Sequence, residues 1–202
     1  MNSLKNPAIT AVLARLHDEA ARDSTRPRDG DAQSLTRRGN IYMAVSPEEG
    51  RLLYLLARGS GAQRIVEFGA SFGVSTTYLA AAARDNGGRL ITTEAHPGKC
   101  AATRATLAEA GLADIATVLE GDARETLADT EPGIEFLFLD GWKGMYLSIL
   151  ELLEPKLADG ALIVADNIDH EGARPYADHV RTNEAFVSHS LRKMEISCFA
   201  PD

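Results

Sequence analysis

The chain has 202 residues, a length suited to one domain with a sizeable hydrophobic core, and 45% of them are hydrophobic. The formal net charge of -8 argues against nucleic acid or an anionic membrane surface as the partner, because no basic excess is available to meet phosphate groups. No apolar stretch reaches the length of a membrane span, and the N-terminus lacks the hydrophobic core of a signal peptide. We therefore expect a cytoplasmic protein in which Cys100 and Cys198 are reduced thiols, although the sequence alone leaves a disulfide open.

The N-terminal segment predicts a helix, because four apolar residues recur at helical spacing: Ile9, Val12, Leu13 and Leu16. Their apolar stripe is a candidate interface for a homodimer. The polar stretch 23–40 predicts a mobile loop and is a candidate lid. Ser46 and Glu49 have the spacing of a capping box, so a helix is expected to start at this point. We expect 1–202 to form a single domain in which 1–45 supply the N-terminal helix and the lid-like segment.

From position 63 onward, strand-like and helix-like segments alternate. The expected strands are 64–68, 89–93, 115–119, 136–140 and 161–166. The expected helices are 75–84, 97–110, a short one from Ala123, 145–157 and 174–182. Two final strand-like runs, 186–191 and 194–199, have no helix between them and predict an antiparallel edge hairpin. The pattern predicts an α/β fold with a doubly wound, mostly parallel, Rossmann-like sheet of seven strands, the last one antiparallel, with helices on both faces.

Two of the expected strands end in oxygen-bearing side chains. One ends at Asp140, and the other ends at Asp166 followed by Asn167. Open α/β sheets bind ligands at the carboxyl ends of their strands, so these three side chains converge if the two strands are neighbours. Three hard oxygen donors suit Mg²⁺ or another divalent cation such as Ca²⁺ or Mn²⁺. Lys143, three residues past the first carboxylate, would then lie close to the metal.

The turn after the first expected strand indicates a nucleoside ligand. Gly69 and Gly73 flank Ser71, which stands where a dinucleotide site prefers a glycine. Glu67 precedes the turn and favours a cationic ligand over a pyrophosphate, which fits the sulfonium and ammonium groups of S-adenosylmethionine. Glu94 ends the second strand, where an acidic residue commonly accepts both ribose hydroxyls. Each feature alone is ordinary turn chemistry or a solvated carboxylate, but their joint order favours an adenosine ligand.

Taken together, these motifs resemble those of the class I, metal-dependent O-methyltransferases, the family that includes catechol O-methyltransferase. The resemblance covers roughly 41–187, and its specific part is Asp140-Gly141-Trp142-Lys143 together with Asp166-Asn167. It implies Mg²⁺ ligation by Asp140, Asp166 and Asn167, and Lys143 as the general base on the acceptor hydroxyl. It also implies a set of cofactor contacts: Met43, Val45, Glu67, Gly69, Ser71, Gly73, Ser75, Glu94, Ala95, Asp122, Ala123, Arg124, Asp140 and Trp142.

The chemistry of methyl transfer to a hydroxyl agrees with those residue types. A phenol has a pKa of about 10, like tyrosine, so the acceptor needs a cation to stabilise its oxyanion and a base to take its proton. A dication and partial desolvation would both lower the pKa of Lys143. The expected reaction is Mg²⁺-assisted methyl transfer to a small, aromatic, vicinal-diol acceptor. The catechol enzymes carry a C-terminal glutamate that contacts the second hydroxyl, and no equivalent can be placed here, which leaves the choice of acceptor open.

Three other functions are weighed against this one. A nicotinamide-dependent oxidoreductase is disfavoured by Ser71, which replaces the middle glycine. A non-catalytic S-adenosylmethionine-binding module has no need of three metal ligands and Lys143. A nucleic-acid methyltransferase is disfavoured by the net charge of -8 and by the absence of an Asn-Pro-Pro-aromatic motif. His170 could face the acceptor and His96 could border the ribose, but the favoured interpretation of both is a loop histidine.

Overall fold

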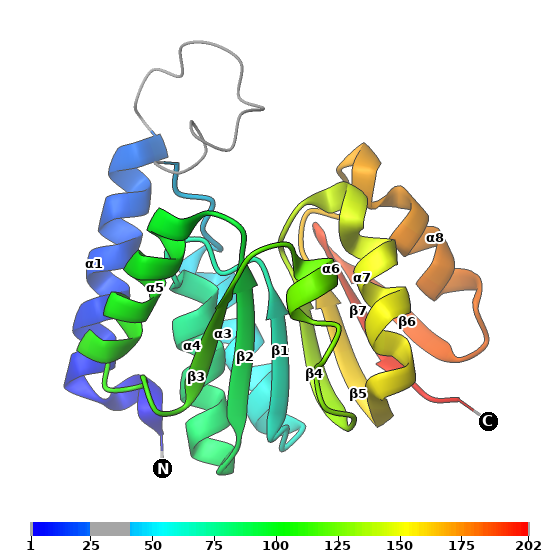
Figure 1. The fold of residues 1–202 in the computed structure, drawn as a ribbon, viewed down its shortest axis with the longest axis horizontal. Coiled ribbons are helices and arrows are strands. Elements are labelled where there is room, and N and C mark those ends of the chain that lie inside the picture. The colour runs from blue at the N-terminus through cyan, green and yellow to red at the C-terminus, as the bar shows by residue number, and fades with distance from the viewer. Residues whose placement is uncertain (1, 25–40, 202) are drawn as a thin grey trace.

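The computed structural model describes residues 2–24 and 41–201, and within them seven strands form one sheet (Figure 1). The order across the sheet is β3-β2-β1-β4-β5-β7-β6. The strands are β1 (Arg64–Phe68), β2 (Arg89–Glu94), β3 (Ala116–Glu120), β4 (Ile134–Leu139), β5 (Leu157–Ala165), β6 (Phe186–Leu191) and β7 (Met194–Phe199). Strands β1 to β5 are parallel, and β7 runs antiparallel to both of its neighbours, β5 and β6. The predicted fold class is confirmed.

Helices cover both faces of the sheet (Figure 1). They are α1 (Pro7–Ser24), α3 (Pro47–Gly59), α4 (Val74–Asn86), α5 (Pro97–Glu109), α6 (Ala123–Thr126), α7 (Tyr146–Leu153) and α8 (Arg174–Thr182). Alternate residues of a strand point to opposite faces, so Phe136 and Phe138 join the core under α1, α3 and α4. Leu137 and Leu139 join the second core, under α7 and α8. The central strands are therefore apolar on both sides, as a parallel sheet requires.

The N-terminal helix packs inside the chain. Its predicted stripe is buried, with exposures of 0% for Ile9, 1% for Val12, 8% for Leu13 and 1% for Leu16, and it belongs to the same core as α3 and α4. The stripe is therefore not available as the dimer interface for which we considered it. The helix runs through Ser24, and the remainder of the predicted lid at 23–40 lies outside the described residues.

The expected helix 145–157 is shorter than predicted. Helix α7 ends at Leu153, a 3-10 turn follows at Glu154–Lys156, and β5 begins at Leu157 rather than at 161. Pro155 explains the early end of the helix, because a proline lacks the N–H that would continue its hydrogen bonding. None of the helices in the described part of the chain is both long and apolar enough to cross a bilayer.

Candidate active site

The carboxyl ends of β1, β4 and β5 lie side by side. Phe68 pairs with Leu139, and Leu139 pairs with Ala165, so the residues that follow these strands share one edge of the sheet. The turns after β1 and β4 touch each other. A Cβ on Gly69, which has a φ of 105°, would lie 2.7 Å from the Cα of Gly141. The absence of a side chain at Gly69 allows the two turns to lie this close to each other.

Glu67 is a fully buried carboxylate beneath the glycine turn. Its Oε2 accepts hydrogen bonds from the hydroxyls of Thr76 and Thr92, both at 2.6 Å. Its Oε1 has no hydrogen-bond partner of ordinary geometry among the described residues. Burial raises the pKa of Glu67, while Ser75 and the two threonines oppose the rise. A buried carboxylate oxygen without a donor suits a cationic ligand group, because such an oxygen is costly to leave unsatisfied.

Glu94 organises the glycine turn from the end of β2. Its Oε2 accepts a hydrogen bond from the backbone N–H of Ser71 at 2.9 Å, and its Oε1 accepts one from the N–H of His96 at 2.9 Å. Ser71 has a φ of 47°, a left-handed conformation that this contact helps to hold. Each oxygen of Glu94 keeps a further lone pair, so the carboxylate still has room to accept ribose hydroxyls.

Helix α5 supports the same turn through residues that the sequence did not reveal. The Thr103 hydroxyl donates to the carbonyl of Ser71 at 2.8 Å. The ammonium group of Lys99, a side chain that is 2% exposed, donates to the Ser71 hydroxyl at 3.2 Å. Lys99 and Thr103 are four residues apart, so they lie on one helix face, and that spacing was the available signal.

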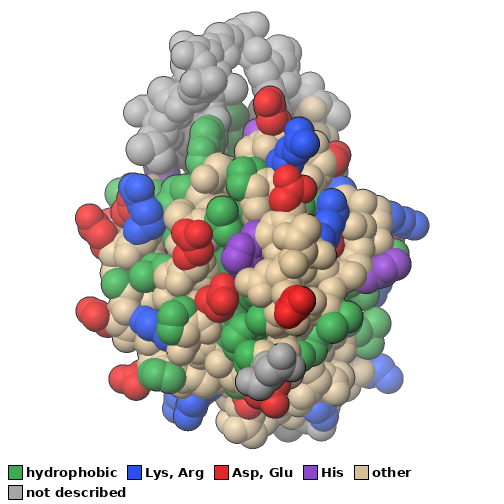
Figure 2. All heavy atoms as spheres, turned by 90° about the vertical axis from the view of Figure 1, so that its right-hand side faces the viewer, with side chains coloured by type: hydrophobic (Ala, Val, Ile, Leu, Met, Phe, Trp, Pro, Cys, Tyr) green, Lys and Arg blue, Asp and Glu red, His purple; other side chains and the backbone are tan. Residues whose placement is uncertain are grey.

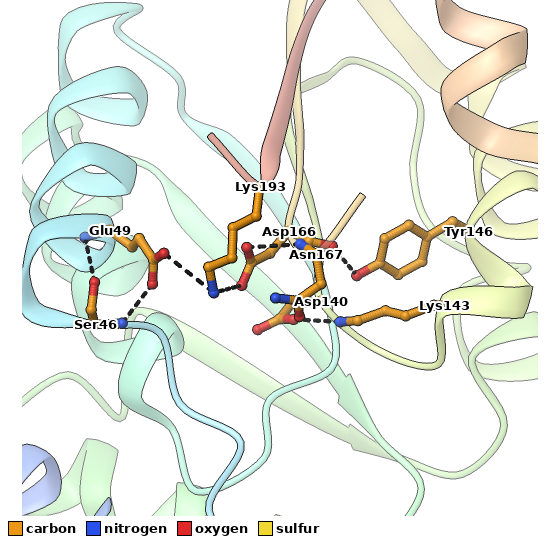
Figure 3. Close-up of polar contacts among 8 residues, drawn as sticks. All are labelled: Ser46, Glu49, Asp140, Lys143, Tyr146, Asp166, Asn167 and Lys193. Atoms are coloured by element: carbon orange, nitrogen blue, oxygen red, sulfur yellow. Dashed lines mark hydrogen bonds and ion pairs between the residues drawn. The ribbon is translucent and has the colours of Figure 1, made fainter. Parts of the chain in front are cut away.

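Asp140 and Asp166 form a pair of largely buried carboxylates at the ends of β4 and β5 (Figure 3). Burial is the main cause that raises the pKa of Asp140 to about 7; the charge of Asp166 adds to the rise and Lys143 opposes it. Burial also raises the pKa of Asp166, against the effect of Lys193. Asn167 follows in a left-handed conformation with a φ of 53°. Two desolvated carboxylates that repel each other favour a cation between them.

Lys143 lies against this pair. Its Nζ donates to the Oδ1 of Asp140 at 2.7 Å and lies 5.2 Å from the centre of the Tyr146 ring. The Tyr146 hydroxyl donates to the backbone carbonyl of Asp166 at 3.0 Å. A 3-10 turn at Lys143–Met145 carries the lysine over the end of β4. The predicted base and predicted metal ligands therefore meet at one point.

A second lysine, which the sequence analysis did not nominate, enters from the β6–β7 turn. The Nζ of Lys193 lies 3.2 Å from the Oδ2 of Asp166 and 3.2 Å from the Oε1 of Glu49 (Figure 3). Burial lowers the pKa of Lys193, but Asp166 and Glu49 outweigh it and the net pKa is raised. No local pattern in the sequence marks Lys193, because its contact depends on the pairing of β7 with β5.

The residues at this point fit a hard divalent cation. Asp140 and Asp166 supply carboxylate oxygens, and the side-chain amide of Asn167 supplies a third oxygen of the kind such ions prefer. In the described part of the chain, no group of three or more His, Cys, Asp or Glu residues could hold a metal ion. A metal at this edge would therefore depend on Asn167 as well as on the two carboxylates.

The other predicted cofactor residues surround the glycine turn or lie beside it. Met43 and Ala44 line a pocket with Ser71 and Ser75, while Val45 is buried. Met43 and Trp142 are each 53% exposed. Gly73, the last residue of the glycine turn, is the N-cap of α4. Ala95 is exposed and directly follows Glu94.

The turn after β3 contains the three residues expected near adenine. Asp122 caps α6 by accepting from the backbone N–H of Arg124 at 2.9 Å, and Ala123 is buried. Hydrogen bonds from Arg124 lower the pKa of Asp122 to about 2. His96 and His170 cap the N-termini of α5 and of a 3-10 turn, which gives both a structural role as loop histidines.

Comparison with known proteins agrees with this geometry. A model of a methyltransferase domain matches residues 66–168. The catechol O-methyltransferase of Mycobacterium tuberculosis is 34% identical over 168 residues, which is 83% of this chain and 67% of that protein. The enzyme of the same name from Bos taurus is 30% identical over 183 residues, which cover 83% of this chain and 67% of that protein. The chain belongs to the class I O-methyltransferases.

Solved structures support the fold of this O-methyltransferase. The crystal structure of the O-methyltransferase from Bacillus cereus in complex with SAH matches with a TM-score of 0.77 and 21% identity, over 94% of this chain and 90% of that one. Membership of this family decides against the nicotinamide-dependent oxidoreductase and the non-catalytic binding module. The protein is an S-adenosylmethionine-dependent O-methyltransferase.

Proposed function

We propose that this O-methyltransferase transfers the methyl group of S-adenosylmethionine to one hydroxyl of a small, aromatic, vicinal-diol acceptor with the help of Mg²⁺ or a similar divalent cation. The observation that carries the proposal is the convergence of Lys143, Asp140, Asp166 and Asn167 at the cofactor edge of the sheet. The relatives named catechol O-methyltransferase support the same acceptor class. We also propose that 1–202 acts as one methyltransferase domain.

The cofactor would lie across the ends of β1 and β2. Glu67 offers its buried, donor-free Oε1 to the positive end of the methionine portion, and Glu94 offers two oxygens to the ribose. Asp122, Ala123 and Arg124 would border the adenine on one side, and the exposed indole of Trp142 would pack on the other. Met43 and Val45 would line the methionine end.

Asp140, Asp166 and Asn167 would hold the divalent ion, which when bound supplies positive charge that stabilises the acceptor oxyanion. Lys143 must first release its own ammonium proton, and its neutral amine would then accept the hydroxyl proton at Nζ. Its side chain is 16% exposed, and Asp140 and the Tyr146 ring fix its direction. Close approach and exclusion of water favour an in-line displacement at the methyl group.

The charge of the protein favours a small molecule over nucleic acid as the acceptor. On the face that carries α8 and β6, acidic and basic side chains are interspersed among the described residues (Figure 2). A nucleic-acid backbone requires a continuous basic surface, and the net charge of the chain is -8. We therefore assign the acceptor to metabolites rather than to nucleic acids.

The proposal is tested by methyl transfer from labelled S-adenosylmethionine to catechol, to its two isomers with non-adjacent hydroxyls, and to phenol, all in Mg²⁺. We expect transfer to catechol and at least a tenfold lower kcat/KM for the other three, because only a vicinal diol can place two oxygens on one metal ion. Equal transfer to all four compounds would rule out recognition of the diol. Such a result would leave the cofactor site unaffected.

A further inference from the structure

The β6–β7 turn delivers a cation to the candidate metal site. Strand β7 pairs antiparallel with β5, with Glu195 opposite Ala165, so the turn that precedes β7 projects past the end of β5. The backbone N–H of Ile168 donates to the carbonyl of Lys193 at 2.9 Å, which ties the turn to the segment after Asp166. The pairing of β7 with β5 and this hydrogen bond therefore hold Lys193 beside Asp166.

The ammonium group of Lys193 has two carboxylate partners at equal distance. Its Nζ lies 3.2 Å from Asp166 and 3.2 Å from Glu49. Only 4% of the Asp166 side chain is exposed, against 19% for Glu49 and 37% for Lys193. Glu49 is fixed in turn, because its Oε2 accepts from the backbone N–H of Ser46 at 2.7 Å. The lysine thus bridges a buried ligand and a more accessible carboxylate.

We infer that Lys193 is a tethered cation that competes with the divalent ion for Asp166, and that metal binding shifts its ammonium group onto Glu49 alone. The inference rests on the proposed metal-assisted function. Asp166 already has an ammonium at hydrogen-bond distance, and a dication at the same carboxylate would repel that ammonium. Glu49 gives the displaced charge a partner close by, so Lys193 does not have to lose all of its ion pairing.

Lys193 differs in this respect from Lys143. Lys143 pairs with Asp140 on the side of the site that faces Tyr146, and no second carboxylate contacts it among the described residues. Lys193 pairs with both Asp166 and Glu49, and so links the candidate metal site to the first turn of α3. If metal binding moves this side chain, the change would reach α3 through its ion pair with Glu49.

The test measures the affinity of the cofactor-free protein for Mn²⁺. Electron paramagnetic resonance at fixed pH and ionic strength monitors the binding. K193M should bind Mn²⁺ about tenfold more tightly than the wild type, because the competing ammonium is gone. R192M is the matched control, since it removes one positive charge from the same turn, and Arg192 has no ion pair among the described residues. Its affinity should stay within about twofold of the wild type.

A double-mutant cycle separates competition from simple charge attraction. E49Q should weaken Mn²⁺ binding in the wild-type background, because Lys193 then has only Asp166 as its partner. Glutamine still accepts the hydrogen bond from Ser46, so the start of α3 is kept. In the K193M background the same E49Q change should have little effect. Thermal unfolding of each variant checks that all of them are folded.

Three results would overturn the inference. Equal Mn²⁺ affinity for the wild type and K193M would remove the competition and leave the metal-assisted function standing. An equal effect of E49Q in both backgrounds would reduce the role of Glu49 to long-range attraction. Absence of Mn²⁺ binding by every folded variant would overturn the inference and the metal-assisted function together.

Discussion

At the scale of single residues, the buried carboxylates of Glu67 and Asp140 differ in their hydrogen-bond and ion-pair partners. Glu67 is held by two hydroxyl donors and keeps one oxygen without a donor, which suits a cationic ligand. Asp140 is already paired with the ammonium group of Lys143, although burial still raises its pKa to about 7. The first carboxylate therefore fits cofactor recognition, and the second fits charge control where the acceptor is expected to lose its proton.

Replacing Lys143 by methionine tests its role as the base. K143M should lower kcat about 10²- to 10⁴-fold, the range of a lost general base, while the affinity for S-adenosylmethionine changes little. Steady-state kinetics and calorimetric titration of the cofactor measure the two effects. K156M is the control, because Lys156 lies at the other end of β5. Unchanged turnover of K143M would remove Lys143 from the mechanism.

At the scale of elements, the site is built from turns that glycine allows to touch. Gly69 combines a φ of 105° with a Cβ direction that points into the backbone of Gly141. Gly87 also has a positive φ, 73°, but a Cβ there would meet nothing within 4 Å. The two positions separate the cost of backbone conformation from the cost of crowding.

G69A should destabilise the fold by about 2–4 kcal/mol, and G87A by about 1–2 kcal/mol, because only the first adds a clash to the conformational strain. Chemical denaturation measures both values. G69A should also lower the affinity for S-adenosylmethionine, since the glycine turn has to move. If the two variants lost equal stability, the close approach of the two turns would not be a constraint on the fold.

The pairing of Glu195 with Arg181 ties β7 to α8. Burial raises the pKa of Glu195, but hydrogen bonds from Arg181 and Ser190 outweigh it and the net pKa is lowered. A lowered folded-state pKa contributes stability that is present above the unfolded value of about 4.3 and is lost as the pH falls through the folded value. E195Q should therefore lose about 1–3 kcal/mol at neutral pH and show a weaker acid dependence below about pH 4. If E195Q left the loss of stability at acid pH unchanged, carboxylates other than Glu195 would dominate that loss.

The sequence predicted the elements whose signal is local. The strands ending at Asp140 and Asp166 are short apolar runs that the sequence predicts. Whether they are neighbours stays open in the sequence, and the pairing of β4 with β5 in the structure answers it. The predicted helix after β4 extends beyond the observed end of α7, because apolar periodicity continues to Leu157. Pro155 stops the helix earlier. Lys193 was missed because its contact depends on the pairing of β7 with β5, which no local pattern specifies.

At the scale of the whole molecule, the topology concentrates the chemistry at one edge. Parallel strands β1, β2, β4 and β5 bring their carboxyl ends together, and the hairpin beyond β5 adds a turn from the far end of the chain. Two hydrophobic cores, one on each face, pack against the sheet beneath that edge. The candidate metal ligands follow β4 and β5, and most of the predicted cofactor residues follow β1, β2 and β3 beside them.

The most direct test of the account is methyl transfer to catechol measured with Mg²⁺, after removal of the ion by EDTA, and after its restoration. The account predicts that EDTA lowers kcat/KM at least about 10²-fold and that added Mg²⁺ restores it, while S-adenosylmethionine still binds in EDTA. Full activity in EDTA would contradict the metal-assisted mechanism and leave Lys143 and Lys193 as the positive groups of the site.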